Sequence, residues 1–116
     1  MSGLKNQIVE AAQDKKAKNV VSIDMREAEG SITDWFIVCN ADSTTQVVAI
    51  ADGIEEKLET TYCEKVWRVE GRENGIWVIM DYGDIMVHIF QTEARDFYAL
   101  EDLWSDLPFE LHHYEE

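Results

Sequence analysis

Four aspartates stand at the ends of predicted strands, where their carboxylates could gather around metal ions: Asp24, Asp34, Asp81 and Asp84. Closely placed carboxylates that hold two metal ions are the chemistry of nucleotidyl transfer. The simpler interpretation is that these side chains bond to backbone amides in turns and helix caps, which is the most frequent role of aspartate at such positions.

The sequence around these aspartates departs from the pattern of a nucleotidyltransferase. Small enzymes of that kind usually show a Gly-Ser pair, a longer spacer and then an Asp-x-Asp on a strand. Here Gly30-Ser31 is followed by Asp34 after only two residues, and no Asp-x-Asp stands downstream. The chain also has only 10 lysines and arginines with which to hold a triphosphate. A metal-dependent nucleotidyltransferase-like enzyme stays as an alternative, and we expect a related fold without the chemistry.

Other catalytic patterns are missing. His88 is the only histidine inside an apolar strand pattern, and no Gly-x-Ser-x-Gly precedes a helix. Gly71, Gly75 and Gly83 are scattered and form no phosphate-binding loop, so they most simply serve turns that need a positive φ. We therefore expect no enzyme, no metal site and no cofactor.

The spacing of apolar residues predicts a mixed α/β order of elements. Helices are expected over residues 3–17, from an N-cap at Ser43 to about Tyr62, and from an N-cap at Thr92 to Trp104. Strands are expected at 19–24, 35–41, 66–69, 76–81 and 85–91, the last two joined by a hairpin turn over 82–84. This order predicts one domain over residues 1–116, a mixed five-stranded sheet with helices packed on it in a nucleotidyltransferase-like topology. We expect a frayed acidic tail from about residue 109 to 116.

The strands at 76–81 and 85–91 carry large apolar side chains on both faces. One face must cover helices, and the other then exposes Trp77, Ile79 and Met86. An exposed patch of this composition is typical of a protein interface. The alternative is that a further helix covers this face, as happens in many α/β sheets.

Net charge limits the partners that the chain can bind. It has 24 acidic and 10 basic residues, a formal net charge of -14. Phosphates are neutralised by lysine and arginine, so extensive contact with nucleic acid or an anionic membrane is not expected. A basic protein surface would attract the chain. Cys39 and Cys63 form no zinc or disulfide spacing, and no signal-peptide core is present, so we expect a reducing cytoplasm.

The run from Gly75 to Phe90, GIWVIMDYGDIMVHIF, is more specific than any of its parts. It resembles the signature of the ribosomal silencing factor family, also called the Iojap-like family. That signature is a tryptophan strand, then Asp-Tyr/Leu-Gly-Asp, then an apolar-His-apolar strand. The following Glu93, Arg95, Phe97-Tyr98 and Leu103-Trp104 are similar to the family as well, and the resemblance covers roughly residues 4–108.

The resemblance implies a non-enzymatic function. Members of the family bind the large ribosomal subunit through large-subunit ribosomal protein number fourteen, sterically block association with the small subunit, and are commonly homodimers when free. Charge alone leaves an acidic adaptor for another basic protein open. The expected site residues lie in the signature run: Trp77 as an apolar anchor; Ile79, Tyr82 and Met86 around it; Asp81 and Asp84 facing basic groups; Gly83 in their turn; and His88 on the adjacent strand.

Overall fold

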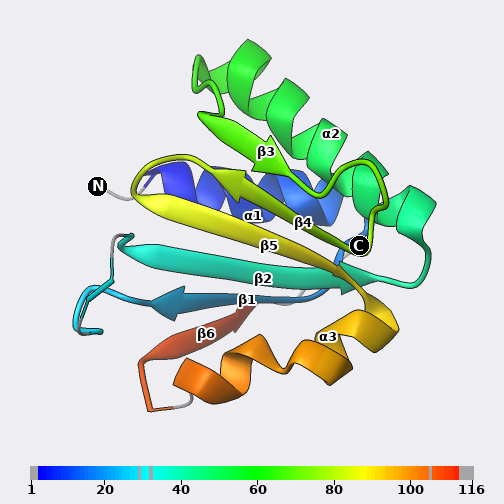
Figure 1. The fold of residues 1–116 in the computed structure, drawn as a ribbon. Helices are drawn as coiled ribbons and strands as arrows, with labels where there is room; N and C mark the ends of the chain where they lie inside the picture. Colours follow the sequence, from blue (N-terminus) through cyan, green and yellow to red (C-terminus); the bar gives the residue numbers. More distant parts are fainter. Residues whose placement is uncertain (1–2, 29, 32, 105, 113–116) are drawn as a thin grey trace.

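The computed structural model describes residues 3–28, 30–31, 33–104 and 106–112. In this part of the chain, three α-helices and one 3-10 helix pack on a mixed six-stranded sheet (Figure 1). In chain order the elements are α1 (Gly3–Asp14), β1 (Lys18–Asp24), β2 (Trp35–Ala41), α2 (Thr44–Tyr62), β3 (Arg68–Glu70), β4 (Trp77–Asp81), β5 (Ile85–Gln91), α3 (Thr92–Tyr98), η1 (Leu100–Trp104) and β6 (Phe109–His112).

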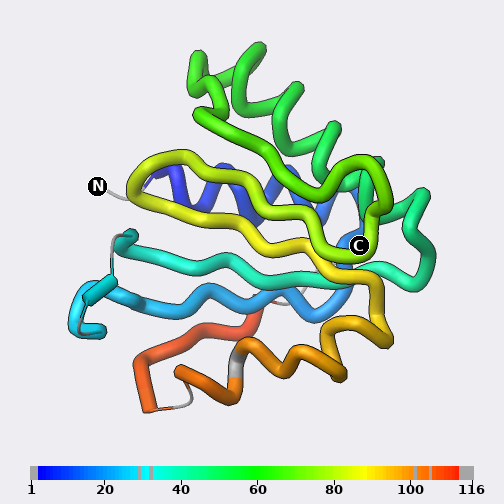
Figure 2. Tube along the Cα trace, viewed as in Figure 1, coloured from blue at the N-terminus to red at the C-terminus, as the bar shows by residue number. Residues whose placement is uncertain are grey.

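The strands lie in the order β3-β4-β5-β2-β1-β6. Only β2 and β5 pair in parallel, with Trp35 opposite Ile85 and Ala41 opposite Gln91. The other pairs are antiparallel. Figure 2 shows β2 and β5 ending at the same edge of the sheet, after which the chain turns upward into α2 and downward into α3.

The larger core lies between the sheet and the pair α1 and α2. The apolar stripe of α2, which includes Ile50, Ile54 and Leu58, is fully buried against strand residues such as Val78 and Val87. Ser43 caps α2 as predicted, because its hydroxyl accepts a hydrogen bond from the Gln46 amide at 3.1 Å. The Gln46 side chain does not complete a capping box and instead donates to the Lys15 carbonyl.

The opposite face of the sheet carries a second, smaller core. Phe90, Val38 and Met25 are buried there under α3 and η1, together with the partly buried Leu100 and Trp104. In Figure 1 these helical segments lie toward β6, at the edge of the sheet opposite β3, and Tyr98 of α3 reaches Trp77 at the start of β4. The prediction that a second face stands open is therefore only partly right, since helical segments cover about half of the strands on it.

The C-terminal segment corrects the predicted tail and the predicted number of strands. Residues 109–112 form β6, which pairs with β1 so that Ile23 lies opposite Phe109 and Val20 opposite His112. A hydrogen bond of 2.9 Å between Ser22 Oγ and His112 Nε2 adds to this pairing. The prediction of a five-stranded sheet and a frayed segment at 109–112 was wrong because the alternation of Phe109 and Leu111 with polar residues spans only four residues, too few to stand out as a strand. Residues 113–116 lie outside the described residues.

Smaller differences concern the ends of elements. The bounds of β2 and β5 match the predicted strands, whereas β3 begins two residues later than expected. The predicted final helix is divided, because Ala99 takes a left-handed φ of 49° and ends α3 before η1 begins. Gln91, not Thr92, is the N-cap residue of α3, and the Thr92 hydroxyl donates to Asp42 Oδ1 at 2.8 Å.

Candidate partner-binding site

Four half-buried side chains remain on the uncovered part of the second face: Trp77, Ile79 and Asp81 of β4, and Met86 of β5. We call this surface the open face. Its members are close neighbours, because Asp81 lies opposite Met86 and Ile79 lies opposite His88 in the antiparallel pair. The structure thus brings together the predicted anchor, two of the apolar residues around it and one predicted carboxylate.

Trp77 is held in one orientation by its neighbours. Its ring stacks on Phe90 with centroids 4.9 Å apart, and Tyr98 of α3 packs against it at 4.9 Å. The indole Nε1 donates a hydrogen bond to His88 Nδ1 at 3.1 Å. A tryptophan fixed in this way presents its remaining surface at little cost in side-chain entropy, as interface anchors do.

His88 lies beneath the open face and does not form part of its surface. It is only 4% exposed and packs edge-on against Phe36 with ring centroids 4.6 Å apart. Burial lowers the pKa of His88 from 6.5 to about 4, so the ring is neutral near pH 7. Since Nδ1 accepts from Trp77, the proton of the neutral ring is on Nε2. His88 is therefore not exposed on the open face in this structure and contacts the anchor itself, while its role toward a partner stays a prediction.

Tyr82 also departs from its expected place. It alternates with Val78 and Met80, so its ring points to the α1 and α2 side and is 5% exposed within the larger core. Burial raises the pKa of its hydroxyl well above the usual value. Tyr82 therefore does not belong to the open face, because its position differs by an odd number from those of Trp77, Ile79 and Asp81, which point there.

Asp81, Gly83 and Asp84 build the hairpin turn at one end of the open face. Asp81 Oδ1 accepts a hydrogen bond from the Gly83 amide at 2.8 Å, and Gly83 has a φ of +89°. The Asp84 side chain is exposed, while its carbonyl accepts from the Thr33 hydroxyl at 2.7 Å. Asp81 thus serves the turn, as the simpler interpretation of the aspartates held, and Asp84 stands available to solvent.

Exposed aromatic side chains border the open face on two sides. Trp67 lies over Gly83 and is 75% exposed. On the α3 side, Tyr98 is 49% exposed and contacts Trp77, and Phe97 beside it is 81% exposed. The sequence predicted one continuous helix from Thr92 to Trp104 and did not place these residues at the site. The left-handed turn at Ala99 breaks that helix.

Carboxylates do not gather around a common point. Asp24 is paired with Arg26 at 2.7 Å, and Asp81 serves the turn. Among the residues that the structure describes, no group of three or more histidine, cysteine, aspartate or glutamate side chains could hold a metal ion. The same described residues include no helix long and apolar enough to cross a membrane.

Comparison with known proteins places the chain in a family. A family model described as "Ribosomal silencing factor during starvation" matches residues 2–116. The ribosomal silencing factor of Halalkalibacterium halodurans is 40% identical over 100 residues, which cover 86% of this chain and 84% of that protein. The corresponding factor of Bacillus subtilis is 37% identical, covering 84% and 81%.

Solved structures agree with this placement. A crystal structure of a Bacillus halodurans protein aligns with a TM-score of 0.81 and 36% identity, covering 95% of this chain and 98% of that one. One from Chromobacterium violaceum aligns with a TM-score of 0.83 and 33% identity, covering 88% and 83%.

The chain is thus a small α/β protein with an apolar open face on its mixed sheet. The chain belongs to the family of ribosomal silencing factors, which are non-enzymatic and bind the ribosome. Membership of this family implies binding to the large ribosomal subunit.

Proposed function

We propose that the chain represses translation by seating its open face on large-subunit ribosomal protein number fourteen, where the bound protein sterically blocks association with the small subunit. The observation that carries this proposal is the half-buried, pre-oriented Trp77 on an uncovered part of the sheet in a member of this family. Blocking of this kind needs only occupied volume at an interface that must close, and no chemical step.

Charge favours a basic protein over RNA as the direct contact. A chain with 24 acidic and 10 basic residues has few groups with which to neutralise phosphates. Asp84 is exposed at the end of the open face, where an arginine or lysine of the partner could bond to it. We therefore propose that the chain acts on cytoplasmic ribosomes by protein–protein contact.

Co-sedimentation with isolated large and small ribosomal subunits tests the proposal. The chain should pellet with the large subunit alone. Trp77→Ala should weaken this binding by about 2 kcal/mol, roughly thirtyfold, because it removes the anchor. Phe109→Ala is the matched control, since it removes an aromatic that is 59% exposed on β6 at the other edge of the sheet.

The outcomes separate this function from its alternatives. Circular dichroism and thermal unfolding of Trp77→Ala must first show that the variant is folded. Unchanged binding of the folded variant would remove Trp77 from the site. Absence of binding to either subunit by the unmodified chain would leave an acidic adaptor for another basic protein, and nucleotide turnover with magnesium or manganese would favour the nucleotidyltransferase alternative.

We also propose that the free chain forms a homodimer through the open face and its exposed border. A two-fold contact lets the same patch serve both copies, and Phe97 adds apolar area beside it. Sedimentation velocity of Trp77→Ala should then show a shift from dimer to monomer. A variant that stays fully dimeric would place the dimer contact elsewhere.

A further inference from the structure

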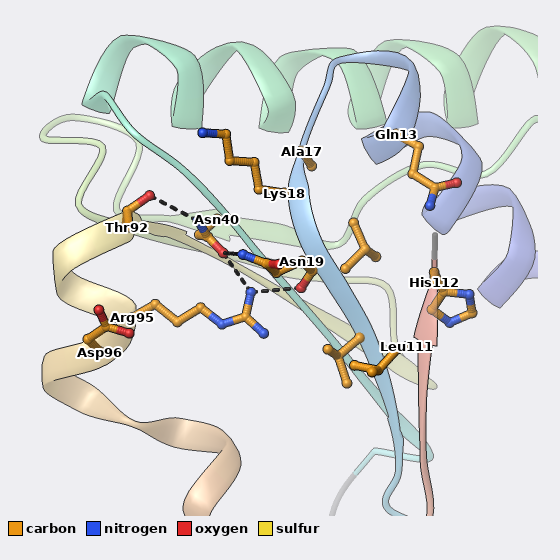
Figure 3. Close-up of a pocket in the computed structure, with 12 residues that line it drawn as sticks. Gln13, Ala17, Lys18, Asn19, Asn40, Thr92, Arg95, Asp96, Leu111 and His112 are labelled. Carbon is orange, nitrogen blue, oxygen red and sulfur yellow. Dashed lines mark hydrogen bonds between the residues drawn. The ribbon is translucent and has the colours of Figure 1, made fainter. Parts of the chain in front are cut away.

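A cavity opens beside α3, at the edge of the sheet where β2 and β5 end (Figure 3). Its volume is about 670 Å³. Binding sites for small molecules usually have volumes of about 300–1,000 Å³. The cavity is lined from five elements, by residues of α1, β1, β2, α3 and β6. The proposed docking to a ribosomal protein makes no use of it.

The topology of the sheet creates this cavity. The parallel neighbours β2 and β5 end at the same edge, but α2 follows β2 on one face and α3 follows β5 on the other. Figure 2 shows the two connections leaving in opposite directions. In open α/β sheets, the crevice at such a switch point, outside the carboxyl ends of the strands, is where ligands bind.

Buried polar groups form the floor of the cavity. Asn40, the penultimate residue of β2, is 2% exposed, and Arg95 of α3 is 8% exposed. Arg95 Nη1 donates to Asn40 Oδ1 and to the Asn19 carbonyl, each at 2.7 Å. The Asn40 amide donates to the Thr92 hydroxyl at 2.9 Å. Figure 3 shows these side chains meeting from three different elements. Burying such polar groups costs free energy, and apolar residues could replace them if only stability mattered.

The backbone at the cavity is irregular as well. Asn19 takes a left-handed φ of 53°, and the pairing of β1 with β2 shifts register between Lys18 and Val21. This bulge turns the Asn19 carbonyl toward Arg95. Bulges and left-handed non-glycine residues concentrate at functional sites, where they re-aim individual groups.

The lining of the cavity is less acidic than the molecule as a whole. Two cations, Lys18 and Arg95, line the cavity with a single carboxylate, Asp96, whereas the whole chain has 24 acidic and 10 basic residues. Lys18 Nζ pairs with Asp42 at 2.7 Å, and both side chains are largely exposed. An exposed pair of this kind contributes little, so the ammonium can turn to a ligand. Val20, Val21 and Leu111 supply an apolar wall.

We propose that this cavity binds a small organic anion, whose carboxylate or phosphate group lies between Lys18 and Arg95 and whose apolar body rests against Val21 and Leu111. This assignment is independent of the open face, because the residues involved differ and binding can be measured on the isolated chain.

Two-dimensional NMR of the amide groups tests the proposal. The probes are benzoate and adenosine monophosphate. Their comparison ligands are acetate and inorganic phosphate, which carry the same kind of charged group without an apolar body. Benzoate or adenosine monophosphate should shift the signals of Asn19, Asn40 and Thr92 in a saturable way, and should bind more tightly than acetate or phosphate. The response of one probe and not the other tells whether the site takes a carboxylate or a phosphate.

Variants at the rim keep the test independent of folding. Lys18→Met should weaken binding about fivefold, since one exposed cation contributes up to about 1 kcal/mol. Leu111→Asp should weaken it further by placing a negative charge on the apolar wall. Lys65→Met, which removes the same charge at an exposed position between α2 and β3, should change nothing. Equal losses in Lys18→Met and Lys65→Met would overturn the proposal, as would unshifted signals with every probe at about 10 mM, well above a millimolar Kd.

Discussion

Trp77 and His88 show how one hydrogen bond links the surface of the site to the core. The indole Nε1 needs an acceptor, and His88 Nδ1 supplies it only while that nitrogen carries no proton. Because His88 is buried against Phe36 and Phe90, its contribution to binding is the orientation of Trp77. His88 is thus a positioning residue in the proposed site.

Replacing His88 by phenylalanine should free the indole while keeping an aromatic ring in the core. The Trp77 Hε1 signal in NMR should move markedly in His88→Phe, whereas the Hε1 signals of the other three tryptophans should move little. Affinity for the large subunit should fall by less than in Trp77→Ala. If the Trp77 signal keeps its position, the hydrogen bond does not hold the ring.

The low pKa of His88 also predicts how stability depends on pH. The pKa is about 4 in the folded state and 6.5 when exposed, so on acidification the unfolded state takes up this proton first. The contribution of neutral His88 to the free energy of unfolding is complete above pH 6.5. This contribution, about 3 kcal/mol in total, is lost as the pH falls from 6.5 toward 4. Urea unfolding at a series of pH values should show this loss in the unmodified chain and not in His88→Phe. Parallel pH profiles would contradict it.

At the scale of elements, the turn between β3 and β4 sets where the open face begins. Gly71 has a φ of +89°, and a Cβ there would lie 2.1 Å from the carbonyl oxygen of Trp77. The close approach of these two backbones is what places the first residue of β4 beside β3. No side chain larger than hydrogen fits between them.

A pair of glycine substitutions separates this close approach from backbone strain alone. Gly71→Ala should lower the free energy of unfolding by about 3 kcal/mol, because strain and a backbone collision add together. Gly30→Ala shares a positive φ of +80°, but its Cβ meets no atom of the described residues within 4 Å, so it should cost about 1 kcal/mol. Urea denaturation measures both. If both substitutions lowered the free energy of unfolding equally, the backbone collision of Gly71→Ala with Trp77 would relax without cost.

The edge strand β6 and the division of the last helix were not visible as local patterns. Phe109 and Leu111 are more than half exposed, so β6 is held mainly by backbone hydrogen bonds to β1, which composition does not record. By contrast, β2 and β5 are buried on both faces, and their continuous apolar runs predicted both strands with their observed bounds.

The net charge acts on the whole molecule and gives its two proposed associations opposite responses to salt. Two copies with a formal charge of -14 repel each other, so added salt should strengthen a homodimer. Docking on a basic ribosomal protein should weaken as salt screens the attraction. Sedimentation in a series of salt concentrations measures both. If added salt changed the affinity of both associations in the same direction, one of the two proposed contacts would be excluded.

Charge reversal near the open face should act mainly on the rate of association. Asp84→Lys should slow binding to the large subunit about threefold and reduce its dependence on salt, because Asp84 is exposed at the end of that face. Glu59→Lys makes the same change on the exposed side of α2, on the opposite side of the sheet, and should have a smaller effect. Stopped-flow kinetics compares them, and equal effects would mean that only net charge matters.

The sequence by itself determined the class of fold, the main helices and strands, the acidic character and the signature run from Gly75 to Phe90, because these depend on periodicity, composition and order along the chain. It also placed Trp77, Ile79, Asp81 and Met86 on one side of the sheet, since alternation in strands is a local property. Tertiary structure decided which of these side chains stay open. The depth of His88, the exposed border at Phe97 and the cavity beside Arg95 depend on how α3 packs across strands distant in sequence, and no local pattern encodes that packing.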